Sequence, residues 1–119
     1  MSVNIDKQED LIPAIIRDKQ PCQETELLFL GYLQDFIERR YREMPEGSYT
    51  TSLFRDGINR MAQKVGEEAI ETVIEATNGT QERLIGEASD LLYHLIVLLT
   101  AKGLRLEDLV QELKKRHNV

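Results

Sequence analysis

Residues 64–75 read KVGEEAIETVIE, and residues 87–99 read EASDLLYHLIVLL. In both stretches apolar residues recur at steps of three and four, which places them on one face of an α-helix. The second stretch is apolar nearly all round after residue 90, so a helix formed there must be covered on several sides. Each stretch also holds one acidic pair spaced by three residues, Glu68 with Glu71 in the first and Glu87 with Asp90 in the second. The two segments predict packed helices whose acidic pairs converge when a short turn folds them antiparallel.

The rest of the chain also favours helices. Apolar spacing predicts helices over residues 26–42 and 106–116, and it extends the two central helices to 53–77 and 80–102. Thr51 or Ser52 is expected to cap the first central helix, and Thr80 the second. With 119 residues and only 6% aromatic residues, the chain fits one helical domain better than a β-sandwich. We therefore expect an all-α fold of four helices joined by short loops.

Composition excludes several classes of protein. A net charge of −6 argues against a general nucleic-acid binder, because such a protein needs a basic stripe to neutralise phosphates. The single Cys22 excludes an intrachain disulfide and a Cys-rich zinc site. Residues 6–10 are charged where a signal peptide is apolar, and the apolar stretch 91–101 is about half the ~20 residues of a membrane span. We expect a soluble, cytoplasmic protein with no nucleic-acid or membrane partner.

Four carboxylates form the candidate site. On a helical wheel Glu68 and Glu71 lie at one edge of an apolar stripe, whereas Glu87 falls inside the next helix's stripe with Asp90 at its border. A carboxylate among apolar residues is costly unless a cation satisfies it, and hard divalent cations prefer oxygen ligands. These residues are therefore expected to bind Mg²⁺, with Mn²⁺ as the alternative. The alternative is that each acidic pair lies on the solvated surface of its helix and binds no ligand.

Basic residues flank these acids. Lys64 lies in the same row of its helix as the acidic pair, and Arg60 lies just outside it, whereas Glu67 is expected to point away. A cation site beside lysine and arginine is typical of phosphate chemistry. Both residues could instead simply balance the acidic charge. His94 is interpreted as a packed, hydrogen-bonded core histidine rather than a ligand.

Several stretches together resemble one enzyme family. Residues 45–50 (PEGSYT), 63–69 (QKVGEEA), 87–95 (EASDLLYHL) and 113–117 (LKKRH) are similar to phosphoribosyl-ATP pyrophosphohydrolase, the second enzyme of histidine biosynthesis. The likeness runs from about Glu26 to Asn118. More broadly, the Glu-x-x-Glu at 68–71 followed by the Glu-x-x-Asp at 87–90 resembles the metal signature of all-α, MazG-like nucleotide pyrophosphohydrolases.

The resemblance implies an activity, a metal and an assembly. The reaction is cleavage of the α–β phosphate bond of phosphoribosyl-ATP, which gives phosphoribosyl-AMP and pyrophosphate. Mg²⁺ dependence and a homodimer, in which a four-helix MazG-like bundle is completed by dimerisation, are implied as well. The same resemblance assigns the metal and the catalysis to Glu68, Glu71, Glu87 and Asp90. We expect Ser48, Tyr49, Arg60 and Lys64 to bind the substrate, the last two by holding the departing pyrophosphate.

The N-terminal residues depart from this family. Residues 6–18 resemble the opening of phosphoribosyl-AMP cyclohydrolase, the next enzyme of the pathway, which many bacteria carry fused in front of the pyrophosphohydrolase. The body of a cyclohydrolase, with its metal-binding cysteines, does not follow. We therefore divide the chain into an N-terminal arm, residues 1–24, and a pyrophosphohydrolase domain, residues 25–119. The arm is either a truncated piece of a bifunctional protein or a natural remnant, and no cyclohydrolase activity is expected of it.

Two other functions and one structural alternative remain open at this point. A house-cleaning nucleoside triphosphate pyrophosphatase would share the carboxylates, although the segment 48–50 argues against it. A helical dimerisation module without activity would need no metal. The dimer itself rests on surplus apolar surface, because Ile70 and Ile74 lie opposite the main stripe of their helix. The alternative cover for that surface is the N-terminal apolar run 11–16.

Overall fold

The structure is a computed structural model that describes residues 23–118. These residues form five α-helices: α2 (Glu24–Glu43), α3 (Tyr49–Asp56), α4 (Ile58–Asn78), α5 (Gln81–Ala101) and α6 (Leu106–Arg116). The described range contains no strand, so the expected all-α class is confirmed. The predicted arm 1–24 and its apolar run 11–16 lie almost wholly outside the described residues, and α2 already begins at residue 24.

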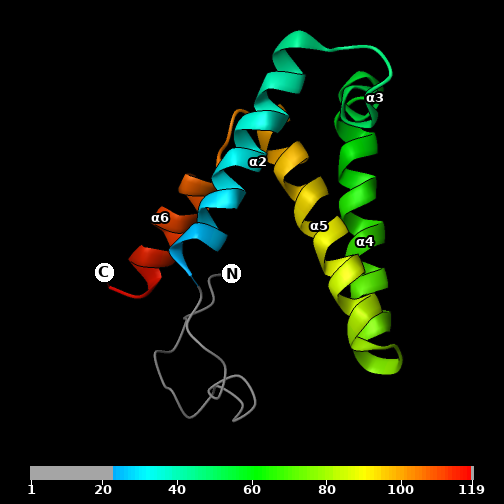
Figure 1. Cartoon of the computed structure of the whole chain (residues 1–119), viewed down its shortest axis with the longest axis vertical. Coiled ribbons are helices and arrows are strands. Elements are labelled where there is room, and N and C mark those ends of the chain that lie inside the picture. Colours follow the sequence, from blue (N-terminus) through cyan, green and yellow to red (C-terminus); the bar gives the residue numbers. More distant parts are fainter. Residues whose placement is uncertain (1–22, 119) are drawn as a thin grey trace.

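The long hairpin of α4 and α5 is the main feature of the fold. The two helices run antiparallel side by side and share the largest helix–helix contact of the molecule (Figure 1). Thr80 caps α5 as expected, since its Oγ1 accepts a hydrogen bond from the backbone N–H of Arg83 at 3.2 Å. The tight turn before it brings the start of α5 alongside the end of α4. Residues from two separate sequence segments thus face one another along the hairpin.

The single helix expected over 53–77 is wrong, because the chain turns at Gly57. Gly57 has φ 95°, a conformation that side-chain-bearing residues rarely adopt, and it separates α3 from α4. The first of these helices begins earlier than predicted. Its cap is Ser48, whose Oγ accepts from the N–H of Thr51 at 3.3 Å, rather than Thr51 or Ser52. The expected four helices therefore become five.

The core lies at one end of the α4–α5 hairpin, where α2 and α3 pack against it. Its buried apolar residues are Ile37, Leu53, Phe54, Met61, Ile96 and Val97. A hydrogen bond and an ion pair hold the start of α6 against α2 beside this core. Gln34, which is 2% exposed, donates from Nε2 to Glu107 at 2.8 Å, and Arg105 pairs with Glu38 at 2.6 Å. In Figure 1 α6 accordingly lies beside α2 and away from the free end of the hairpin.

The free end of the hairpin exposes apolar side chains. Ile70, Val73 and Ile74 of α4 are between 51% and 63% exposed, and Ile85 of α5 is 67% exposed. The α5 helix is long and apolar enough to qualify by length and composition as a membrane span, but core helices of soluble proteins pass the same test. Of the most apolar segment of this helix, only 22% is buried within the described chain. Exposed apolar side chains gathered in this way are typical of an interaction surface.

Candidate active site

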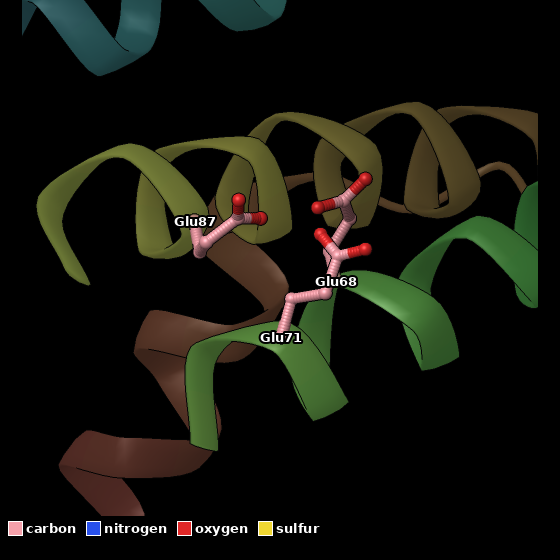
Figure 2. A group of neighbouring side chains, drawn as sticks. All are labelled: Glu68, Glu71 and Glu87. Atoms are coloured by element: carbon pink, nitrogen blue, oxygen red, sulfur yellow. The ribbon is translucent and has the colours of Figure 1, made fainter. Parts of the chain in front are cut away.

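Three carboxylates converge between α4 and α5. One oxygen from each of Glu68, Glu71 and Glu87 can be chosen so that all three atoms lie within 4.8 Å of one another. Figure 2 shows Glu68 and Glu71 on α4 and Glu87 on α5, with their carboxyl groups gathered in the space between the ribbons. The spacing of three residues puts the first two on one helical face, and the antiparallel hairpin brings the third to them. The predicted convergence of the two helices' acids is thus present for these three residues.

The charges of this cluster perturb one another. Sharing of a proton with Glu71 and Glu68, together with partial burial, raises the pKa of Glu87 to about 7. Glu68 is only 6% exposed, and burial works to raise its pKa, but the hydrogen bonds with Glu87, Lys64 and Glu71 lower it overall. One carboxylate is therefore held ionised beside another that readily keeps a proton at neutral pH.

Two oxygens of the cluster are left without partners. The Oε2 atoms of Glu68 and Glu87 are buried, and neither has a hydrogen-bond partner among residues 23–118. A buried carboxylate oxygen in that state is costly, and a cation bound between the carboxylates would satisfy both atoms. The donor set consists only of carboxylate oxygens, which suits Mg²⁺ or Mn²⁺ and does not suit zinc.

Lys64 is the basic group attached to the cluster. Its Nζ lies 3.3 Å from Oε1 of Glu68 and 3.6 Å from Oε2 of Glu67. Burial works to lower the pKa of Lys64, but the hydrogen bond to Glu68 and the electrostatic interactions with Tyr49, Glu68 and Glu67 raise it overall. The side chain is therefore an ammonium. Glu67, which was expected to point away from the acidic row, is not part of the carboxylate cluster, but it shares the ion pair of Lys64 and accepts a hydrogen bond from Gln63 Nε2 at 2.7 Å.

Two predicted site residues lie outside the cluster. Asp90 is exposed on α5 and is not among the carboxylates whose oxygens meet between the helices. Arg60 is exposed near the start of α4, and no ion pair to it occurs within the described range 23–118. The structure therefore joins three of the four predicted carboxylates to one of the two predicted cations.

A polar hollow lies at the start of α3. It has a volume of about 440 Å³ and is lined by Gly47, Ser48, Tyr49, Ser52, Arg55 and other residues of that segment. Two of the expected substrate residues, Ser48 and Tyr49, thus lie together at its wall. Arg55 and Ser52 were missed from the sequence, where they carry no signal beyond their closeness to the segment 48–50.

Tyr49 and Thr50 bind α3 to α5. The hydroxyl of Tyr49 lies 2.8 Å from Nε2 of His94, and Thr50 Oγ1 bonds to the hydroxyl of Tyr93. His94 is 6% exposed and hydrogen-bonded through both ring nitrogens, which confirms the interpretation of a packed core histidine. Its link to Tyr49 was missed, because the two residues are 45 positions apart and no local pattern joins them.

Known proteins resemble this chain over the helical region. Residues 30–117 match the family described as phosphoribosyl-ATP pyrophosphohydrolase. A histidine biosynthesis bifunctional protein HisIE from Bacteroides thetaiotaomicron is 68% identical over 95 residues, which cover 80% of this chain and 47% of that protein. The bifunctional protein of the same name from Bacillus subtilis is 54% identical over 89 residues, or 75% of this chain and 43% of that protein.

A shorter relative matches almost end to end. The phosphoribosyl-ATP pyrophosphatase of Leptospira biflexa is 48% identical over 90 residues, which are 76% of this chain and 98% of that protein. By contrast, the chain spans about half the length of the bifunctional relatives that it matches. The likeness therefore covers the helices that hold the carboxylates and extends to α6.

Proposed function

Because the chain belongs to the phosphoribosyl-ATP pyrophosphohydrolase family, we propose that it hydrolyses the α–β phosphate bond of phosphoribosyl-ATP. The products are phosphoribosyl-AMP and pyrophosphate, and the reaction is the second step of histidine biosynthesis. A relative named phosphoribosyl-ATP pyrophosphatase, matched over 98% of its length, supports this assignment. The structural observation that carries it is the cluster of Glu68, Glu71 and Glu87 joined to Lys64.

The cluster is proposed to hold Mg²⁺, or Mn²⁺ in its place. Glu68, Glu71 and Glu87 supply the oxygens, two of which are buried and unpartnered among the described residues. Asp90 is proposed as a further ligand, since it lies one helical turn beyond Glu87 and its exposed side chain is free to turn toward the cluster. When bound, the divalent cation would polarise a phosphoryl oxygen and offset the charge that develops on it.

The protein's own groups handle the proton and the phosphates. A carboxylate of the cluster that is not fully used as a metal ligand is proposed to accept the proton of the attacking water. Lys64 has three N–H donors, so it can keep Glu68 in place and still donate to a phosphate oxygen. Arg60 lies one turn before Lys64 on α4 and is proposed to contact the departing pyrophosphate as well.

The rest of the substrate is proposed to occupy the polar hollow at the start of α3. Ser48 and Tyr49 line that hollow, and Tyr49 also interacts electrostatically with Lys64, which pairs with Glu68 of the cluster. We propose that the substrate extends from the hollow to the cluster past Tyr49. We assign this activity to residues 25–119, and we expect no cyclohydrolase activity from residues 1–24.

We also propose that the active form is a cytoplasmic homodimer with neither a nucleic-acid nor a membrane partner. Ile70, Val73, Ile74 and Ile85 are more than half exposed at the free end of the α4–α5 hairpin. A twofold partner that packs the same surface against them would cover it. The net charge of −6 argues against a nucleic-acid partner.

The assignment is tested by comparing substrates. Pyrophosphate release from phosphoribosyl-ATP is measured beside release from common and non-canonical nucleoside triphosphates at equal concentration. We expect phosphoribosyl-ATP to be turned over with by far the highest kcat/KM. A preference for a non-canonical triphosphate would replace the proposal with the house-cleaning function, and no release from any substrate would favour a non-enzymatic dimerisation module.

A further inference from the structure

His94 of α5 makes one hydrogen bond through each ring nitrogen. Its Nδ1 lies 2.7 Å from the backbone carbonyl oxygen of Asp90, and its Nε2 lies 2.8 Å from the hydroxyl of Tyr49. A carbonyl oxygen can only accept, so the hydrogen of the neutral ring must be on Nδ1. Nε2 is then bare and accepts the hydrogen of the Tyr49 hydroxyl. The carbonyl of Asp90 thus fixes the tautomer, and the tautomer fixes the direction of the bond from Tyr49.

This direction determines what the Tyr49 oxygen can do. The Tyr49 side chain is 54% exposed, whereas His94 is 6% exposed, so the phenol stands between the core and the polar hollow. With its only hydrogen committed to His94, the phenol oxygen has lone pairs alone to offer on its open side. A group that accepts hydrogen bonds, such as a phosphate oxygen, is therefore a poor partner there. A substrate hydroxyl, which donates, is a good one.

We propose that His94 is a positioning residue that holds the Tyr49 hydroxyl as a hydrogen-bond acceptor for a sugar hydroxyl of the substrate. The proposal rests on the function proposed above, whose substrate carries ribose hydroxyls. His94 is on the helical face of Glu87 and Asp90, at spacings of seven and four residues. The single helix α5 therefore carries Glu87, Asp90 and the histidine that orients the Tyr49 phenol.

The structure offers a matched control for this pair. Tyr93 and Thr50 form a second side-chain hydrogen bond between α5 and α3, next to the bond of His94 with Tyr49. Tyr93→Phe removes that bond and leaves the bond between Tyr49 and His94 in place. If His94 merely clamps the two helices, the loss of either bond should have the same effect on catalysis.

Two replacements of His94 separate the roles of its ring nitrogens. In His94→Gln the amide oxygen is placed near the position of Nε2 and can still accept from Tyr49, whereas the amide of His94→Asn is too short to reach it. We expect His94→Asn and Tyr49→Phe each to raise KM about tenfold with little change in kcat, as loss of one hydrogen bond would. His94→Gln and Tyr93→Phe should stay within about threefold of the wild type in KM.

The double variant His94→Asn/Tyr49→Phe makes the test decisive. Because His94 acts through Tyr49, the KM of the double variant should be no higher than that of the worse single variant. A KM that multiplies the two single effects would overturn the proposal, and so would a Tyr93→Phe variant as impaired as His94→Asn. Thermal unfolding of each variant shows whether the fold is retained.

A readout without turnover keeps this proposal separate from the proposed function. The chain has two histidines, so ¹⁵N-histidine labelling gives two rings, and His94→Gln identifies which signals belong to His94. At pH 8 without substrate we expect a His94 ring protonated on Nδ1, with an Nε2 signal that shifts in Tyr49→Phe. A hydrogen on Nε2, or an unchanged signal, would overturn the pairing. Failure of the wild type to release pyrophosphate would instead overturn the proposed function alone.

Discussion

Glu87 of α5 faces Glu68 of α4 across the helical hairpin, with carboxylate oxygens of the two residues no more than 4.8 Å apart. Of these two carboxylates, Lys64 pairs with Glu68 alone within the described part of the chain. Carboxylates this close resist ionising together, and hydrogen bonding of Glu87, first with Glu71 and then with Glu68, raises its pKa to about 7. The two carboxylates thus repel one another, and this repulsion supports our proposal that a divalent cation binds between them.

The first prediction concerns stability without metal. The folded-state pKa of Glu87, about 7, lies above its ordinary value of 4.5, so the folded state binds a proton more tightly between these values. The stabilisation of the folded state by the proton on Glu87 is present at low pH and is lost as the pH rises through 7. In EDTA, Tm should therefore fall from pH 5 to pH 8. Glu87→Gln should flatten this decline and raise Tm at pH 8. An unchanged decline in the variant would show that Glu87 is not its source.

The second prediction concerns metal binding. Mg²⁺ must displace the proton that Glu87 holds below pH 7, so its affinity should be about tenfold lower at pH 6 than at pH 8. Calorimetric titration at the two pH values measures this difference. Glu82→Gln, which removes an exposed carboxylate of the first turn of α5, is the control and should bind Mg²⁺ as the wild type does. Equal loss of binding in Glu82→Gln and Glu87→Gln would mean that the cluster is not the site.

The third prediction ranks the carboxylates. Glu71→Gln removes a member of the cluster and should lower the Mg²⁺-dependent rate about a hundredfold or more, with the helical content retained. Asp90→Asn should lower it less, by about tenfold, because Asp90 has to turn toward the cluster to take part. Steady-state kinetics of both variants at saturating Mg²⁺ give the ranking. A greater loss for Asp90→Asn than for Glu71→Gln would contradict the site described here.

The fourth prediction concerns the assembly. Ile74 is 51% exposed near the free end of the hairpin, and Ile74→Asp would place an unpaired charge in the proposed contact. Sedimentation at micromolar concentration should find the wild type as a dimer and the variant with a larger monomer fraction. Leu104→Asp, at a 43% exposed residue in the loop between α5 and α6, is the control and should remain dimeric. A monomeric wild type would refute the dimer.

The sequence predicted the positions of most helices because apolar spacing is a local signal. It failed at Gly57, since a glycine within a helical pattern is tolerated as often as it breaks the helix, and only the φ of 95° decides. The cap at Ser48 was missed for the same reason, because the helix that it caps was taken to start later. The start of α5, marked by the capping residue Thr80, and the end of α6, marked by basic residues in its last turn, were predicted closely.

The site likewise contains residues that could be predicted from local spacing and residues that depend on how the helices pack. Glu68, Glu71 and Glu87 were predictable from spacing plus a hairpin. Asp90 has the same spacing of three residues from Glu87 but is exposed outside the cluster, because the packing of α5 against α4 decides which residues face the other helix. The pairing of Glu67 with Lys64 follows from their spacing of three residues, which the helical wheel underweighted. The bond between Tyr49 and His94 depends on how α3 packs on α5, and the sequence holds no local trace of it.

The central claim is that this carboxylate cluster hydrolyses phosphoribosyl-ATP with the help of a divalent cation. The most direct measurement follows pyrophosphate and phosphoribosyl-AMP formed from phosphoribosyl-ATP by the wild type and by Glu87→Gln, in Mg²⁺ and in EDTA. We expect equal amounts of the two products from the wild type in Mg²⁺, and nearly none in EDTA or from the variant. Product formation by the wild type in EDTA, or an undiminished rate for Glu87→Gln in Mg²⁺, would contradict it.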